Sequence, residues 1–308
     1  MQIFHNPNIN FVGYRKMFLR ASIIITIIGI ILIPTIGMDF GIDFEGGTEM
    51  ITEFAKPINT ERIRDAVIGL GIEGAEIKSF GGDNQYIIRI KHSGTPASTI
   101  AEAIDKAIPD IDMKLIKVDE IGAKIGAETR NQAFIAMGLA MLGLLIYIAF
   151  RFEFVYGVGA VFAILHDIII TFVISLIIHR LGVTQIEINQ TFLAAILTVI
   201  GYSINDTVII FDRIRENMVV MKGKTISDIT NASINETLSR TVITVLTVVI
   251  VLVVLIILGG PVLLPFAIVM LLGVVFGTYS SIYIASNVVI ILHERKDRAA
   301  LATATKKA

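Results

Sequence analysis

Six long runs of apolar residues divide the chain, and about 20 such residues are what a helix needs to cross a membrane. The runs cover residues 18–38, 131–150, 154–178, 188–211, 241–258 and 265–292. They predict an α-helical membrane protein with six transmembrane helices, flanked by a cytoplasmic segment at 1–17 and a cytoplasmic tail at 293–308. The first run is too long for a signal peptide and no cleavage pattern of small residues follows it, so we expect a retained anchor.

Residues 39–130 form the one large stretch without such a run, and its apolar positions change period. Alternation predicts strands, and a three-to-four-residue spacing predicts helices. The predicted elements are strands at 49–54, 76–80, 85–90 and 113–118, helices at 60–70 and 98–108, and a turn "GGDN" at 81–84. We expect Thr60 to cap the first helix and Gly71 to end it. The order βαββαβ predicts a small α+β domain with a ferredoxin-like fold.

Composition supports the membrane class and excludes several functions. Hydrophobic residues make up 54% of the chain, charged residues 17%, and the mean hydropathy is +0.77. A formal net charge of −1 gives no basic field of the kind that binds nucleic acid, so we expect no such partner. The chain has no cysteine, which excludes disulfides and thiolate metal sites.

Lysine and arginine gather on one side of the predicted spans. That side has Arg15, Lys16, Arg151, Arg213, Arg215, Lys222, Lys224, Arg240, Arg295, Lys296, Arg298, Lys306 and Lys307. The short loops opposite have only Arg180. By the positive-inside rule, we expect both termini in the cytoplasm and the domain at 39–130 outside it.

Asp206 lies inside the fourth apolar run, where a charged side chain costs on the order of 3 kcal/mol. Tyr202 and Ser203 precede it by four and three residues, so the three share one semi-polar face of the helix. An intramembrane acid is a candidate functional group, and we expect Asp206 to carry protons. The alternative is a structural hydrogen bond between helices.

Arg240 stands at the start of the fifth run and is the candidate cation for Asp206, because a long arginine side chain can reach inward. Thr237, Thr244 and Thr247 lie on the same helical face. This spacing predicts a polar seam between the fourth and fifth spans. An equally open alternative is that Arg240 only fixes the topology of the chain.

His166 and Asp167 lie in the middle of the third run and could extend a proton relay, or could simply bond neighbouring helices. A serine dyad of Ser203 with His166, or an aspartyl dyad of Asp206 with Asp167, lacks the motifs that such enzymes need. The chain also has no phosphate-binding P-loop. We therefore expect no enzyme, no cofactor and no metal.

The last run carries Gly273, Gly277, Ser281 and Ala285 at four-residue spacing, which predicts close packing of another helix. Pro265 starts this run, and the first turn of a helix is where proline costs least.

Seven ordered motifs carry a resemblance to a known family. They are "GIDFEGGTEM" (41–50), "IGAKIGAE" (121–128), "FRFEFVYGVGAVFAILHD" (150–167), "TVIGYSINDTVIIFDRIREN" (198–217), "ETLSRT" (236–241), "GGPVL" (259–263) and "GTYSSIYIAS" (277–286). Through them the chain resembles the SecF proteins of the SecD/SecF family, bacterial protein-export membrane proteins of the resistance-nodulation-division superfamily. It departs from the family's usual pattern at Ala123, where proline is the rule.

The resemblance implies a multi-pass subunit of the bacterial inner membrane that pairs with SecD and associates with the SecYEG channel and often YajC. It implies that proton flow drives movement of extracytoplasmic domains and helps to draw preproteins across after the ATPase SecA has pushed them in. By motif, Asp206 in "SIND" matches the family's proton-conducting acid, and Arg240 in "LSRT" matches the arginine beside it.

Two other functions stay open. One is a proton-coupled small-molecule exporter of the same superfamily, although such chains carry about twice the spans. The other is a non-transporting scaffold of the channel, in which Asp206 would be a structural hydrogen bond.

Overall fold

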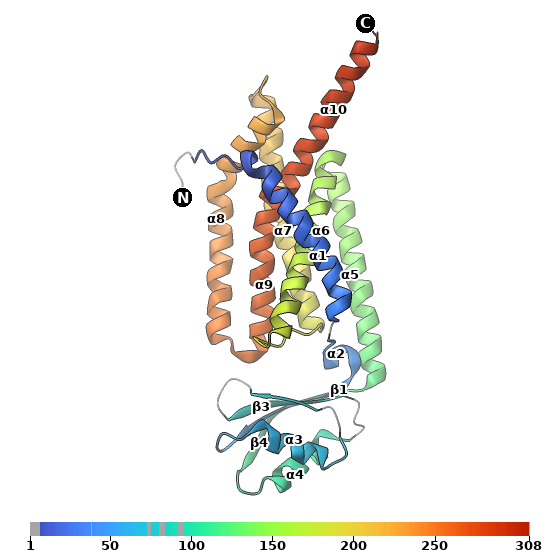
Figure 1. Ribbon diagram of the computed structural model, residues 1–308, viewed down its shortest axis with the longest axis vertical. Helices are drawn as coiled ribbons and strands as arrows, with labels where there is room; N and C mark the ends of the chain where they lie inside the picture. Colours follow the sequence, from blue (N-terminus) through green and yellow to red (C-terminus); the bar gives the residue numbers. More distant parts are fainter. Residues whose placement is uncertain (1–6, 38, 73–74, 80–83, 92–94, 308) are drawn as a thin grey trace. The chain divides into compact units, whose positions relative to one another are not determined.

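The structure is a computed structural model that describes residues 7–37, 39–72, 75–79, 84–91 and 95–307. The chain forms two compact units (Figure 1). The helical unit comprises Met1–Met38, Met137–Ile186 and Ala194–Ala308, and the α+β unit comprises Asp39–Ala136 and Glu187–Leu193. Three predicted features reach outside the described residues: the end of the first run at 38, the strand end at 80 and most of the turn at 81–84.

Long helices account for most of the helical unit. They are α1 (Arg15–Ile36), α5 (Ala123–Arg151), α6 (Phe154–Arg180), α7 (Gln190–Val220), α8 (Ile226–Leu258), α9 (Gly260–Ser280) and α10 (Ser286–Lys307), with a 3-10 turn η1 (Val12–Tyr14) before α1 and a π-helical turn η2 (Ser281–Ala285) joining α9 to α10. Six stretches among the described residues are helical, long and apolar enough to cross a membrane. This finding confirms the predicted fold class.

Several helices are longer than the apolar runs. α8 begins at Ile226 although the predicted span begins at 241, and α7 continues to Val220 although its span ends at 211. The reason is that a backbone helix continues through polar residues, whereas an apolar run stops at the first charges. The bounds of the spans within the bilayer stay predictions.

Pro265 does not lie in the first turn of its helix, so that prediction is wrong. α9 begins at Gly260 and has Pro265 in its interior. The uncharged stretch "GGPVLLP" (259–265) is therefore helical from Gly260 onward and is not a loop that ends before the helix.

α6, α7 and α9 provide the interior of the helical unit. In each of these helices we consider the apolar stretch of 18 residues that could cross a membrane. Of this stretch, 50% is buried in α6 and 56% in α7, but only 6% in α5. The glycines of α9 permit close packing, as their spacing predicts: a Cβ at Gly277 would lie 3.0 Å from the Cβ of Ser203, and one at Gly273 would overlap Val199. A contact of this kind places the α7 backbone directly against α9.

The α+β unit has the predicted ferredoxin-like topology. After a short helix α2 (Ile42–Glu45) come β1 (Gly47–Phe54), α3 (Thr60–Ile68), β2 (Glu76–Ser79), β3 (Gln85–Ile90), α4 (Ala97–Ala107) and β4 (Met113–Ile121). The four strands form an antiparallel sheet in the order β2-β3-β1-β4. Figure 1 shows α3 and α4 together on one face of this sheet, and a core that includes Met50, Ile88 and Ile100 lies between the layers.

The caps of α3 differ from the prediction. Asn59, not Thr60, caps the helix, because its side chain accepts a hydrogen bond from the backbone N–H of Glu61. The helix ends at Ile68, with Gly69 as its C-cap, and Gly71 follows with a φ of 75°. Asparagine is as good an N-cap as threonine, so the choice between neighbours depends on the chain's approach to the helix.

Candidate functional site

Asp167 is a buried carboxylate with partners at both oxygens. It lies in α6 and is 1% exposed. Its Oδ2 accepts hydrogen bonds from the hydroxyls of Ser203 on α7, at 2.6 Å, and Ser280 on α9, at 2.7 Å. Its Oδ1 lies 3.1 Å from Nδ1 of His166. The carboxylate therefore joins α6, α7 and α9.

His166 extends this cluster toward α1. Its ring packs against Tyr279, with the centroids 6.0 Å apart. The hydroxyl of Tyr279 donates to the carbonyl of Phe18 at 3.0 Å and lies 2.7 Å from the hydroxyl of Ser22. Four helices thus meet around two adjacent polar residues of α6.

Asp206 is equally buried, at 1% exposed, but it is poorly bonded. Its Oδ2 lies 3.5 Å from the hydroxyl of Thr278 on α9, and its Oδ1 has no hydrogen-bond partner in the described structure. The hydroxyl of Thr278 is closer to the carbonyl of Val274, at 2.9 Å. Because one hydroxyl carries one hydrogen, the bond to Asp206 is weak.

The residues of the polar face predicted on α7 do not all lie at the same carboxylate. Ser203 turns to Asp167, and no hydrogen bond joins it to His166 among the described residues, so the imagined serine dyad has no counterpart. Tyr202 lies one turn before Asp206, and its buried hydroxyl likewise has no partner in the parts of the chain that are described. Two buried polar atoms without a hydrogen-bond partner, Tyr202 Oη and Asp206 Oδ1, therefore belong to residues one helical turn apart on α7.

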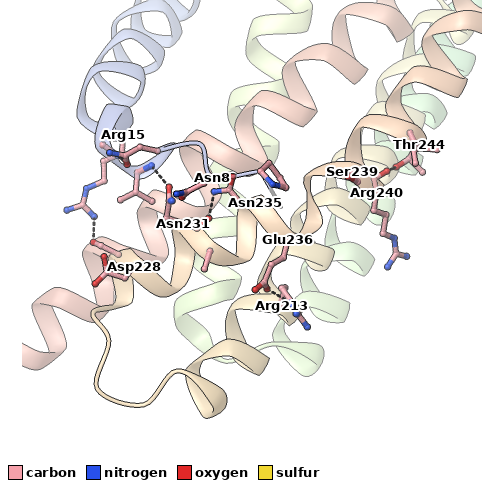
Figure 2. Close-up of a pocket in the computed structure, with 17 residues that line it drawn as sticks. Asn8, Arg15, Arg213, Asp228, Asn231, Asn235, Glu236, Ser239, Arg240 and Thr244 are labelled. Atoms are coloured by element: carbon pink, nitrogen blue, oxygen red, sulfur yellow. Dashed lines mark hydrogen bonds and ion pairs between the residues drawn. The ribbon is translucent and has the colours of Figure 1, made fainter. Parts of the chain in front are cut away.

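Arg240 is exposed and lies on α8 beside a polar cavity of about 1520 Å³. In Figure 2, Arg213 is joined to Glu236, whereas the guanidinium of Arg240 has no marked interaction with the residues drawn. No hydrogen bond or ion pair joins it to Asp206 within the described ranges, although its charge acts on that carboxylate at longer range.

The predicted threonine seam is not a network between helices. The hydroxyl of Thr244 donates to the carbonyl of Arg240 at 2.5 Å, and Thr237 and Thr247 also donate to carbonyls of their own helix. Threonine in a helix commonly bonds back in this way. The prediction of a seam between the fourth and fifth spans is therefore wrong for these hydroxyls.

Sequence reasoning missed Ser280, Thr278 and the π-helical turn that follows them. The stretch "TYSSIY" (278–283) is the polar interruption of the last apolar run and was the available signal. The backbone N–H of Ser286 donates to the carbonyl of Ser281, five residues back, which is the bond that defines the wider turn. The hydroxyl of Ser286 donates to the same carbonyl at 2.8 Å. Such turns are rare in proteins, but those that occur often lie at functional sites. Here the turn follows directly after Ser280.

The described residues contain no group of three or more His, Asp or Glu residues that could hold a metal ion. The side chains of the site are two carboxylates, hydroxyls and an imidazole, and such groups can accept and donate protons. The site has the composition of a proton site in membrane helices.

Comparison with known proteins identifies the family. The family model "Protein export membrane protein SecD/SecF, C-terminal" matches residues 100–295, which is more than half of the chain. The model "SecD/SecF GG Motif" matches residues 31–58. The chain belongs to the SecD/SecF family.

Relatives in this family are similar over nearly their full length. Two proteins named "Protein translocase subunit SecF", from Calditerrivibrio nitroreducens and Rhodothermus marinus, are each 39% identical to the chain, over 96% and 99% of it and 97% and 100% of the relative. The crystal structure of SecDF from Thermus thermophilus, described as a translocon-associated membrane protein, superposes with a TM-score of 0.81 at 29% identity. That alignment covers 94% of this chain but only 39% of SecDF.

The GG motif of the SecD/SecF family has a physical basis in this structure. Gly46 and Gly47 have φ angles of 79° and 144°, which disfavour residues with a side chain. A Cβ at Gly46 would lie 2.6 Å from the Cα of Ala123, where α5 begins. The glycine pair therefore lets the chain entering β1 pass directly against the start of α5.

Proposed function

We propose that this chain is a subunit of the Sec protein-export machinery that couples proton flow to movement of its α+β domain and so assists preprotein translocation. The single observation that carries the proposal is Asp206, a fully buried carboxylate with one unbonded oxygen and one weak contact. A carboxylate bonded so poorly is costly as a structural element and suited to gaining and losing a proton.

The relatives support the proposed partners. The aligned SecDF chain contains this chain's equivalent as 39% of its length, so we infer that a separate SecD subunit supplies the remainder. The relatives' name, translocase subunit, supports association with the SecYEG channel and preproteins. We extend the proposal to YajC, and to SecA as the source of the first push.

The orientation belongs to the same proposal. Both termini would lie in the cytoplasm and the α+β unit outside the inner membrane, as the basic flanks indicate. The proton gradient then supplies the energy without a cofactor. One charge moved across 100 mV yields about 2.3 kcal/mol, enough to bias a two-state domain movement of a few kcal/mol within one or two cycles.

The test is Asp206→Asn in membranes that contain SecD and SecYEG. We expect it to reduce the proton-motive-force-dependent part of preprotein export by at least about tenfold, because asparagine cannot carry a proton. The measurement is export into inverted membrane vesicles with and without an uncoupler. The matched control is Asp212→Asn, six residues further along α7, whose carboxylate is half-exposed and lies 3.4 Å from Arg151.

Export at the wild-type rate by an assembled Asp206→Asn complex would leave only a scaffold role. The small-molecule exporter is tested by copurification, since recovery of drug-efflux partners without SecD would favour it. The names of the relatives favour export of proteins.

A further inference from the structure

The start of α7 belongs to the α+β unit. Residues Glu187–Leu193 form one compact unit with Asp39–Ala136, although fifty residues separate them in the sequence. α7 begins inside this segment, at Gln190, and continues without a break to Val220. Asp206 lies 16 residues after Gln190, or about 24 Å along the helix at 1.5 Å per residue.

Backbone hydrogen bonds fasten this segment to the residues that lead into the domain. The N–H of Ile188 donates to the carbonyl of Asp39 at 3.0 Å, and the N–H of Gly41 donates to the carbonyl of Ile188 at 3.1 Å. The two bonds form a parallel bridge between Phe40 and Ile188. The Asn189 side chain then caps α7 by accepting from the N–H of Phe192 at 2.8 Å.

A cluster of charges fastens the same segment to the sheet. Arg89 on β3 forms ion pairs with Glu187 and with Glu49 on β1, and its Nη1 lies 3.6 Å from Glu76 on β2. The side chains of Arg89 and Glu187 are only 12% and 8% exposed. Burial lowers the pKa of Arg89, but the charges of Glu187 and Glu49 outweigh it and raise that pKa above its ordinary value. Arg89 therefore stays charged, and its ion pair with Glu187 joins the segment at 187–193 to β3.

This cluster is unlike the other ion pairs of the domain. The pair of Arg62 with Asp110 is about half exposed and joins only parts of the domain itself. Exposed pairs contribute little, whereas a buried pair that loses one partner leaves an uncompensated charge. The arrangement around Arg89 holds the first residues of α7 against the sheet.

We propose that Arg89 and Glu187 are positioning residues that clamp the start of α7 to the sheet, so that a displacement of α7 at Asp206 is passed to the α+β domain. This inference rests on the proposed function, because it requires that Asp206 drives the movement. Neither residue carries the proton. Their role is to keep the segment at 187–193 attached to the sheet when α7 moves.

The test compares Glu187→Gln with Asp110→Asn in the assembled complex with SecD. Both changes turn an acid into its amide and remove an arginine's partner in the same domain. We expect Glu187→Gln to reduce the proton-motive-force-dependent part of export at least about fivefold, with the ATP-driven part unchanged. Asp110→Asn should stay within about twofold of wild type.

Hydrogen exchange separates a clamp from a merely structural role. In the Glu187→Gln complex, the amides of 187–193 should exchange faster while those of β1 and β3 keep their protection. Faster exchange throughout the domain would contradict the proposal, because the export defect would then reflect a loosened fold. If Glu187→Gln does not assemble, Arg89→Lys keeps the charge but not the two-pronged geometry, and the same exchange pattern with a smaller export loss is expected.

The two proposals fail in different ways. Wild-type proton-dependent export in Glu187→Gln, together with its loss in Asp206→Asn, would overturn the clamp and leave the proposed function standing. Retention of that export in Asp206→Asn would overturn both.

Discussion

Asp167 and Asp206 are two carboxylates of the same helical unit, both 1% exposed, with opposite surroundings. Asp167 has a partner at each oxygen and draws hydroxyls from two other helices. Asp206 has one long contact and one oxygen without a partner among the described residues. Solvent exposure does not separate the two residues, but their hydrogen bonding does.

This difference in hydrogen bonding indicates which carboxylate is suited to a structural role and which to proton exchange. A carboxylate that accepts several hydrogen bonds resists any change of charge or position, because each donor would lose its partner. A carboxylate without such bonds has little to lose when it gains a proton. Asp167 therefore joins α6, α7 and α9, and the weak bonding of Asp206 supports our proposal that it exchanges protons.

The largest effect is expected for Asp167→Ala, which tests whether Asp167 stabilises the fold more than Asp206 does. We expect the free energy of unfolding to fall by about 2–4 kcal/mol, because two hydroxyls and an imidazole lose their shared partner in a buried site. Reversible unfolding of the purified protein in detergent measures it.

The control for Asp167→Ala is Asp206→Ala, which should leave the free energy of unfolding unchanged or slightly higher. It removes a buried polar group that has almost no bonds to lose. Equal losses of stability in the two variants would break the comparison and return Asp206 to a structural role.

Much of this architecture could be predicted from the sequence. The six apolar runs and the βαββαβ pattern are properties of single segments, and periodicity reports such properties directly. Asp206 and Asp167 could be singled out because any acid in an apolar run is conspicuous.

The partners of these acids could not be predicted in the same way. Ser280 lies 113 residues from Asp167, and Ser203 lies 36 residues from it, so only the packing of three helices decides that they meet. The pairing of Arg240 with Asp206 stays a prediction. The position of Arg240 near the start of the fifth run suggested a partner for Asp206, yet its side chain is exposed and unpaired within the described chain.

A smaller effect is expected for Ser203→Ala, which removes one of the two hydroxyls from Asp167. The free energy of unfolding should fall by about 0.6–1.7 kcal/mol, which runs from the average to the largest value found for hydrogen bonds between membrane helices. Ser280→Ala should cost less than Ser203→Ala, because the Ser280 hydroxyl has a second acceptor at 3.0 Å, the carbonyl of Gly277. The same unfolding measurement checks both variants. The double variant should lose more than the sum, since Oδ2 of Asp167 keeps one hydroxyl donor in each single variant and loses both in the double variant.

The smallest effect is expected for Thr278→Val, which tests how little Asp206 depends on its one contact. Valine keeps the shape of threonine and removes the hydroxyl that lies 3.5 Å from Asp206. We expect the free energy of unfolding to change by less than about 0.5 kcal/mol, because the hydroxyl's shorter bond is to its own helix and adds little there. Proton-dependent export should keep its wild-type rate. A loss of export as large as that of Asp206→Asn would mean that Thr278 holds the carboxylate in place, and Asp206 would then resemble Asp167 in needing a fixed partner.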